Sequence, residues 1–232
     1  MVEVVMEGPA KNALGKALMD QAIAQIEAAN GEPLLIRGAG DAFSAGLNLK
    51  EILELEADGM KEFLDTLGKL LSVLWHYPGP TVAAVNGHAI AGGALVAMVC
   101  DHRVCSSDAR VRVGLNEVAI GVRFPPFVLR LVEARLGPRS LAEVILGAHL
   151  FAPEDALRVG LVDELAEDVL EVATARLKHL SSHDAAVYRA TKAAMRPVFA
   201  PTEEEERVFM TEVLPVWCGE GLKSRIRAMF RR

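Results

Sequence analysis

Cysteine is scarce in this sequence, and no long uninterrupted apolar run occurs. The 232 residues include three cysteines, an odd number without the spacing of a disulfide framework, which fits a reducing compartment. The longest apolar stretch, residues 83–100, is broken by glycines and polar residues, so it does not predict a membrane span. The first seven residues contain two acids and no basic residue, unlike a signal peptide. We therefore expect a cytoplasmic protein.

Basic residues are also fewer than acidic residues. The chain has 25 Lys and Arg against 31 Asp and Glu, and a formal net charge of −6. No surface-wide positive field is available to attract nucleic acid or anionic lipid, so we expect neither as a partner. Apolar residues make up 51% and charged residues 24%, which is typical of a folded globular chain with a sizeable core.

Short β-rich runs alternate with helical stretches before about residue 154. The runs are residues 33–37, 81–85, 101–105 and 111–113, and the helical stretches between them are residues 13–29, 48–55, 60–75 and 92–100. Charged helices alone are expected after that point, over residues 154–159, 167–180, 184–195 and 202–213. This order predicts an α/β core with a helical C-terminal extension. Recurring strand–turn–helix units fit a superhelix of ββα turns, and a doubly wound sheet remains the alternative.

Three segments contain residue types that could carry chemistry. Residues 42–51 and 86–94 place small residues and glycines before a helix, where unpaired backbone amides can bind an oxyanion or a phosphate. Residues 113–121 place one carboxylate, Glu117, among apolar neighbours, which should raise its pKa. Taken singly, each segment also fits ordinary turn chemistry or a solvated carboxylate. Their combination is more specific than any one of them.

Several motifs follow one another over nearly the whole chain. They are Lys11-Asn12-Ala13-Leu14, Phe43-Ser44-Ala45-Gly46, Val85-Asn86-Gly87 through Gly92-Gly93, Cys100-Asp101-His102-Arg103, and Gly160-Leu161-Val162-Asp163. In order and spacing they resemble the crotonase (enoyl-CoA hydratase/isomerase) superfamily. Residues 45–47, 91–97 and 114–117 are most similar to the mitochondrial-type Δ3,Δ2-enoyl-CoA isomerases. The resemblance implies a crotonase (ClpP-like) spiral of ββα units over residues 1–180 and a helical trimerisation region over residues 181–232.

The resemblance also implies roles for individual residues. The backbone amides of Leu47 and Gly92 would form an oxyanion hole, and Glu117 would be the catalytic base. The residues implied to contact the CoA thioester are Ala13, Ala45, Gly46, Leu47, Asn48, Leu49, Lys50 and Gly92. For Lys50, an exposed lysine on a helix face is the alternative interpretation.

The implied partner is an acyl-CoA thioester, and the implied assembly is a homotrimer or a dimer of trimers. Coenzyme A would enter as part of the substrate, so we expect no separate cofactor and no metal.

Position 95 distinguishes between two reactions of the superfamily. Hydratases use two glutamates to hold and activate water, and Glu117 matches the second of them. The first would fall at Leu95, which can neither bind water nor transfer a proton. The sequence therefore favours a one-base Δ3,Δ2-enoyl-CoA isomerase. An enoyl-CoA hydratase, another crotonase-type reaction, and a non-catalytic acyl-CoA-binding or assembly subunit remain alternatives.

Other chemically suggestive residues are expected to be structural. Cys100 and Cys105 would point to opposite faces of a strand, so they do not predict a metal site. His88 is expected to pack or to hydrogen-bond within the protein. Trp217 and Lys223 resemble positions that close over the CoA of a neighbouring subunit, with a core tryptophan and a surface lysine as the alternative.

Overall fold

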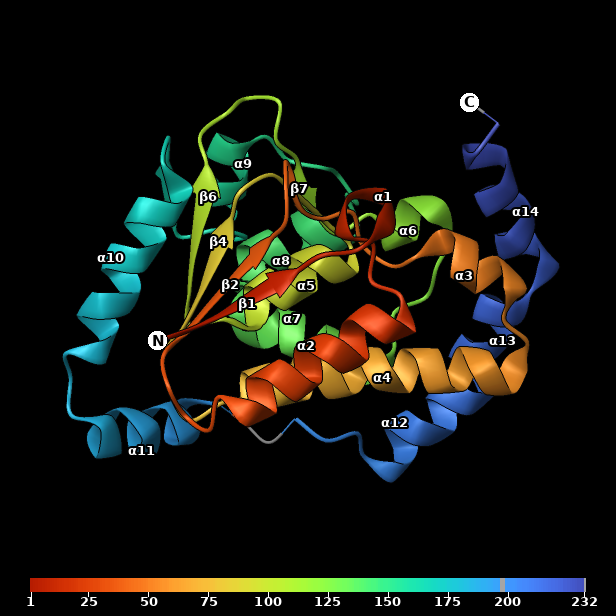
Figure 1. Cartoon of the computed structure of the whole chain (residues 1–232). Helices are drawn as coiled ribbons and strands as arrows, with labels where there is room; N and C mark the ends of the chain where they lie inside the picture. Colours follow the sequence, from red (N-terminus) through yellow and green to blue (C-terminus); the bar gives the residue numbers. More distant parts are fainter. Residues whose placement is uncertain (197–198, 232) are drawn as a thin grey trace.

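A five-stranded parallel sheet forms the centre of the computed structural model, which describes residues 1–196 and 199–231 (Figure 1). In spatial order its strands are β1 (Val2–Met6), β2 (Leu34–Gly38), β4 (Thr81–Val85), β6 (His102–Ser106) and β8 (Glu164–Ala166). Each neighbouring pair is parallel. Because both faces of a parallel sheet are covered, its central strand β4 is buried along its whole length.

Alternating side chains of the inner strands enter two separate cores. On β2, Leu34 and Ile36 point into the larger core, whereas Leu35 points into the smaller one. The smaller core lies under α10 (Val169–Ser181). The helices that contribute to the larger core on the opposite face include α2 (Lys16–Ala28), α4 (Ala57–Trp75) and α5 (Gly92–Val99) (Figure 1).

A second parallel sheet contains β3 (Ala42–Ser44), β5 (His88–Ile90) and β7 (Val113–Gly114). Each of its strands follows a strand of the large sheet and precedes a helix: α3 (Leu49–Glu54) after β3, α5 after β5, and α6 (Glu117–Ile120) after β7. The chain thus repeats a ββα unit three times. This confirms the predicted superhelix over the doubly wound alternative. It also brings the starts of α3, α5 and α6 to the region beyond the small sheet.

The expectation of helices alone after residue 154 is wrong. The three-residue strand β8 follows α9 (Pro153–Arg158) and pairs with β6 at the edge of the large sheet. A strand of this length is too short to show a period of two. Helices α7 (Pro126–Arg135) and α8 (Pro138–Ile145) were not predicted, although each starts at a proline in the first turn, a position where proline is favoured.

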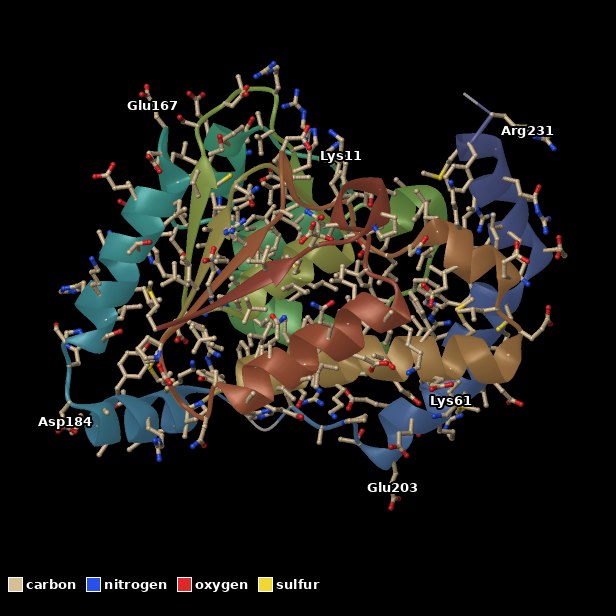
Figure 2. The ribbon with its side chains drawn as sticks, viewed as in Figure 1. Lys11, Lys61, Glu167, Asp184, Glu203 and Arg231 are labelled. Atoms are coloured by element: carbon tan, nitrogen blue, oxygen red, sulfur yellow. The ribbon has the colours of Figure 1, made fainter. Side chains whose placement is uncertain are left out.

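The C-terminal segment passes along two sides of the molecule. It comprises α11 (Ala185–Met195), α12 (Glu203–Val208), the π-helical turn η1 (Phe209–Val213), α13 (Leu214–Cys218) and α14 (Glu220–Met229). Figure 1 shows α11 beyond one end of α10 and α14 beside α3 on the opposite side of the molecule. Charged side chains such as Lys61, Asp184 and Glu203 project outward (Figure 2). A role of residues 181–232 in trimerisation stays a prediction.

No helix within the described parts of the chain is long and apolar enough to cross a membrane.

Candidate active site

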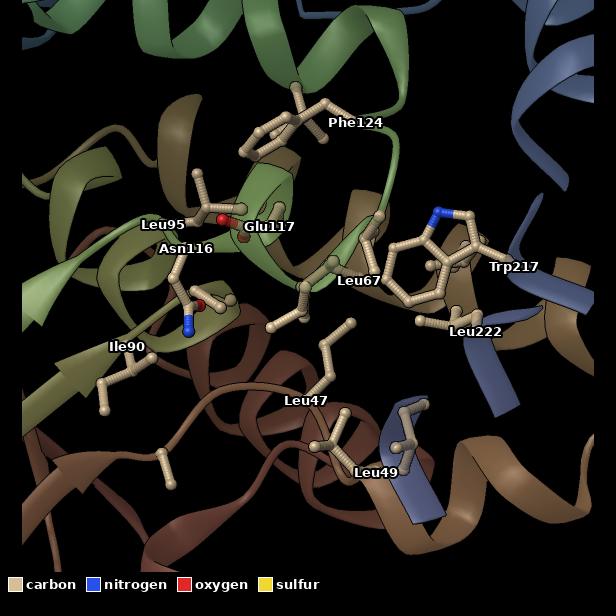
Figure 3. A pocket seen from close by; sticks show the side chains of 18 of the residues that line it. Leu47, Leu49, Leu67, Ile90, Leu95, Asn116, Glu117, Phe124, Trp217 and Leu222 are labelled. Carbon is tan, nitrogen blue, oxygen red and sulfur yellow. The ribbon is translucent and has the colours of Figure 1, made fainter. Parts of the chain in front are cut away.

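A cavity of about 290 Å³ lies where α5, α6 and the C-terminal helices meet (Figure 3). Its wall is mostly apolar: the lining includes Leu47, Leu49, Leu64, Leu67, Ile90, Leu95, Ile120, Val122, Phe124, Val128, Trp217, Leu222, Ile226 and Met229. Among the described side chains that line it, only Asn116, Glu117 and Trp217 carry nitrogen or oxygen atoms. An apolar cavity with few polar groups is typical of a small-molecule site.

Glu117 is the ionisable side chain in this cavity. It is the first residue of α6, directly after the turn that follows β7, and it is 6% exposed. Its Oε2 atom has no hydrogen-bond partner among the described residues. Burial disfavours the charged carboxylate and raises the pKa of Glu117 from 4.5 to about 7. The apolar neighbours thus have the predicted effect, and the carboxyl can accept and return a proton near neutral pH.

The backbone amide of Leu47 is left free by a parallel β-bridge to Leu14. Leu14 donates its N–H to the Gly46 carbonyl at 2.7 Å and accepts a hydrogen bond from the Asn48 N–H at 3.0 Å. In such a bridge the two hydrogen bonds of Leu14 are made with Gly46 and Asn48, the residues on either side of Leu47. The N–H of Leu47 itself therefore points away from Leu14. Within the described residues this N–H reaches no acceptor. It can therefore bind an oxygen of a ligand.

The Gly92 amide is free for a different reason. Ala91 adopts a positive φ of 50° and donates its N–H to the Gly114 carbonyl at 2.8 Å, which turns the chain sharply into α5. Gly92 is the first residue of that helix, and first-turn amides have no acceptor inside the helix. A Cβ atom on Gly92 would lie 3.1 Å from Leu47 Cδ2. The two residues with free amides are thus neighbours at the wall of the cavity.

Most residues implied in thioester contacts lie at or beside the cavity. Ala45, Leu47, Leu49 and Gly92 line it. Gly46 has φ +91°, and a Cβ atom there would come within 2.8 Å of the Ile90 carbonyl oxygen. Glycine at position 46 thus allows the loop to approach β5 closely.

Asn48, Ala13 and Lys50 lie outside the wall. Asn48 caps α3 by accepting a hydrogen bond from the Glu51 N–H. Ala13 is buried, and Lys50 is exposed with its Nζ 6.0 Å from the centre of the Phe230 ring. Contacts of all eight residues with CoA stay predictions.

Three of the chemically suggestive residues have structural roles. Burial raises the pKa of both the Cys100 and Cys105 thiols to about 12. The Nδ1 atom of His88 accepts a hydrogen bond from the Arg112 N–H at 3.0 Å. Within the described residues, no group of three or more His, Cys, Asp or Glu side chains is arranged to hold a metal ion.

The interpretation of Lys223 as a surface lysine is wrong. Lys223 is 7% exposed, and its Nζ donates to the Leu55 carbonyl at 3.0 Å, at the C-terminal end of α3. Helix C-termini carry partial negative charge, which favours a cation there. Trp217 is buried as expected of a core tryptophan, donates its Nε1–H to the Arg123 carbonyl at 3.0 Å, and lines the cavity of its own chain.

The C-terminal helix α14 contributes to the cavity, which was not predicted from the sequence. Leu222, Ile226 and Met229 recur at helical spacing and line it. That spacing was visible in the sequence and marks an apolar helix face, but it does not say which surface the face covers. Arg225 donates to the Ile120 and Gly121 carbonyls at 2.9 and 3.0 Å, which ties α14 to the end of the helix that carries Glu117.

The family model described as enoyl-CoA hydratase/isomerase matches residues 1–215. A putative enoyl-CoA hydratase from Thermus thermophilus is 34% identical over 225 residues, covering 91% of this chain and 85% of that relative. The mitochondrial enoyl-CoA delta isomerase 1 of Homo sapiens is 31% identical over 160 residues, covering 68% of this chain and 53% of that relative.

Solved structures of an isomerase and of a probable hydratase are both similar to this chain. Human mitochondrial Δ3,Δ2-enoyl-CoA isomerase superposes with a TM-score of 0.88 at 23% identity, covering 99% of this chain and 93% of that one. A probable enoyl-CoA hydratase from Mycobacterium tuberculosis gives a TM-score of 0.78 at 29% identity, covering 99% and 92%. The first likeness shows a shared fold. Both hydratases and isomerases thus occur among the proteins that this chain is similar to.

Proposed function

Because the chain belongs to the enoyl-CoA hydratase/isomerase family, we propose that it converts 3-enoyl-CoA thioesters into 2-trans-enoyl-CoA thioesters. One observation supports the isomerase over the hydratase. Glu117 and Leu95 line the same cavity, and Glu117 is the only ionisable side chain among the described residues that line it. A single carboxyl can carry a proton from one carbon to another, whereas activating a water molecule and protonating the carbon in an addition call for a second group that can transfer a proton.

The proposed mechanism uses the free amides and the buried carboxyl together. The thioester oxygen accepts hydrogen bonds from the Leu47 and Gly92 amides, which acidifies the C2–H bond. Loss of one such donor typically costs about 2.7–4 kcal/mol of transition-state stabilisation. Glu117 takes the C2 proton, and the electron pair delocalises into a dienolate whose charge rests on the thioester oxygen. The same carboxyl returns the proton to C4, so the reaction is balanced without water or a cofactor.

The pKa of Glu117 suits both halves of this reaction. With a pKa of about 7, the carboxylate is available at neutral pH and its conjugate acid is strong enough to return the proton. Hydration is the second candidate, because a 34% identical relative carries the name putative hydratase. Against it, Leu95 is 2% exposed and offers no polar atom to a water molecule in the cavity.

A product assay tests the proposal. We expect purified protein and a medium-chain 3-enoyl-CoA to yield 2-enoyl-CoA without 3-hydroxyacyl-CoA, as followed by chromatography and mass spectrometry. Formation of the hydroxyacyl product would instead establish the hydratase. Binding of the thioester in a thermal-shift titration without any turnover would favour a non-catalytic acyl-CoA-binding protein.

Gly93→Ala tests the close approach of the two amide-bearing loops. A Cβ atom on Gly93 would lie 2.5 Å from the Ser44 carbonyl oxygen, so residues 44–47 must move away from α5. We expect turnover to fall about 10²-fold, comparable to the loss of one oxyanion donor. Gly137→Ala is the matched control, because an added Cβ there meets nothing within 4 Å and φ is −62°. Equal activity of the two variants would contradict the proposed role of this packing.

A further inference from the structure

Asn116 is a polar residue of the cavity to which the mechanism above gives no role. It occupies the position before the first turn of α6, where an asparagine commonly accepts a hydrogen bond from a first-turn amide, but its side chain caps nothing. The carboxamide is half-buried, and no hydrogen bond links it to another described residue. Figure 3 shows it directed into the cavity. A ligand that fills the cavity would bury this group, at a cost of about 1–3 kcal/mol unless the ligand itself bonds it.

Asn116 and Gly92 follow the last paired residues of the small sheet. Strands β5 and β7 pair Ala89 with Val113 and Ile90 with Gly114. Gly92 and Asn116 each come two residues after the last of these pairs, and both line the cavity. The two chains are still in contact at this point, because the Ala91 N–H donates to the Gly114 carbonyl at 2.8 Å. The carboxamide and the free Gly92 amide therefore face the same cavity and can meet the same ligand.

The carboxamide does not serve the catalytic carboxyl. Glu117 Oε2 is buried without a partner, so Asn116 does not orient it through that atom. The two side chains also point in different directions in Figure 3. The unpaired carboxamide of Asn116 and the unpaired carboxyl of Glu117 thus present two separate polar groups to one ligand.

We propose that Asn116 is a third donor to the thioester oxygen, through its Nδ2–H. The inference rests on the proposed function, because that oxygen gains negative charge only when C2 loses its proton. The carboxamide stays neutral and transfers no proton, so Glu117 remains the sole proton carrier. A hydrogen bond to a charged oxygen is roughly twice as strong as one to a neutral oxygen. The contribution of Asn116 therefore falls on the dienolate rather than on the bound substrate.

The test compares a charged and an uncharged thioester on the full chain. Acetoacetyl-CoA can bind as its enolate, whereas butyryl-CoA is a neutral thioester without that charge. We expect Asn116→Ala and the similarly sized Asn116→Leu to weaken acetoacetyl-CoA binding at least about tenfold and to change butyryl-CoA binding less than about twofold. We expect kcat for 3-enoyl-CoA to fall about 10²-fold in both, the range typical of one lost oxyanion donor. Asn116→Asp should be worse, since it places negative charge beside the enolate.

The outcomes separate this inference from the proposed function. If the wild-type chain isomerises 3-enoyl-CoA but the variants keep its kcat and both affinities, Asn116 is not a donor and the isomerase stands. Equal weakening of both thioesters would also overturn the inference, because it indicates general packing. A third outcome is that the wild-type chain isomerises no 3-enoyl-CoA, while the Asn116 variants still bind acetoacetyl-CoA selectively more weakly than wild type. In that case the isomerase proposal fails and the Asn116 assignment stands.

Discussion

Glu117→Gln is expected to fold like the wild-type chain and to lose about 10³-fold or more of its isomerase turnover. Glutamine keeps the size of the side chain but cannot accept a proton from C2, and a general base typically contributes about 10²–10⁴-fold. The measurement is kcat with the same 3-enoyl-CoA as for the wild-type chain. A variant that retains turnover within about tenfold of wild type would remove Glu117 from the role of base.

The pH dependence of activity follows from the same group. With the pKa of Glu117 at about 7, kcat/KM of the wild-type chain should rise with pH and level off above that value. The residual activity of Glu117→Gln should lack this rise.

The free energy of unfolding should decrease as pH rises, which is the direction expected for a buried carboxyl that is neutral at low pH. The pKa is about 7 in the folded chain against 4.5 for the ordinary group. The stability that the protonated form contributes is therefore complete below pH 4.5 and is lost as pH rises through 7. The loss amounts to about 3 kcal/mol. Thermal unfolding should show Glu117→Gln more stable than wild type at pH 8 and nearly equal to it at pH 4.

How far the fold could be predicted depended on the length of each element and on the turn or helix-start residues at its ends. Strand β4 was predicted over its whole length because five apolar or β-favouring residues end at Asn86-Gly87. Strand β8 was missed because three residues cannot show alternation. Prolines 126 and 138 were available as helix-start signals, yet proline also marks turns, and only tertiary packing distinguishes the two.

The site could be predicted where it depends on local sequence and not where it depends on distant contacts. Gly92 at a helix start and Glu117 among apolar neighbours are local features. The role of the Leu47 amide was implied by the family resemblance, but its physical cause is the bridge to Leu14, which lies 33 positions earlier in the printed sequence. Trp217 joins the cavity from a helix far along the chain. Residues of this kind become part of a site through packing that no local pattern encodes.

Asp101 holds the C-terminal segment to the large sheet, and it does not line the apolar cavity. One carboxylate oxygen accepts hydrogen bonds from Lys192 Nζ at 2.8 Å, the Tyr188 hydroxyl at 3.0 Å and the Thr81 N–H at 2.8 Å. The other accepts from Arg196 Nη2 at 2.5 Å. The side chains of Lys192 and Arg196 are each only 8% exposed. One buried carboxylate thus compensates two buried cations.

Asp101→Asn should therefore destabilise the protein strongly while leaving the chemistry of the cavity intact. Removing one partner of a buried ion pair typically costs about 3–5 kcal/mol, because the remaining charge stays uncompensated. For a chain of this size we expect the melting temperature to fall by roughly 10 °C. Asp41→Asn is the matched control: its partner Lys11 lies at 3.2 Å, both side chains are exposed, and its melting temperature should barely change.

Combining Asp101→Asn with Lys192→Met distinguishes electrostatics from lost packing. Burial already lowers the pKa of Lys192 to about 8, and the charge of Asp101 opposes that shift. Without Asp101 the lysine is a buried cation without a carboxylate, so replacing it by an apolar side chain of similar length should recover part of the lost melting temperature. Further destabilisation by the second substitution would mean that Lys192 stabilises the chain through its bond to the Gly79 carbonyl, at 2.8 Å, rather than through Asp101.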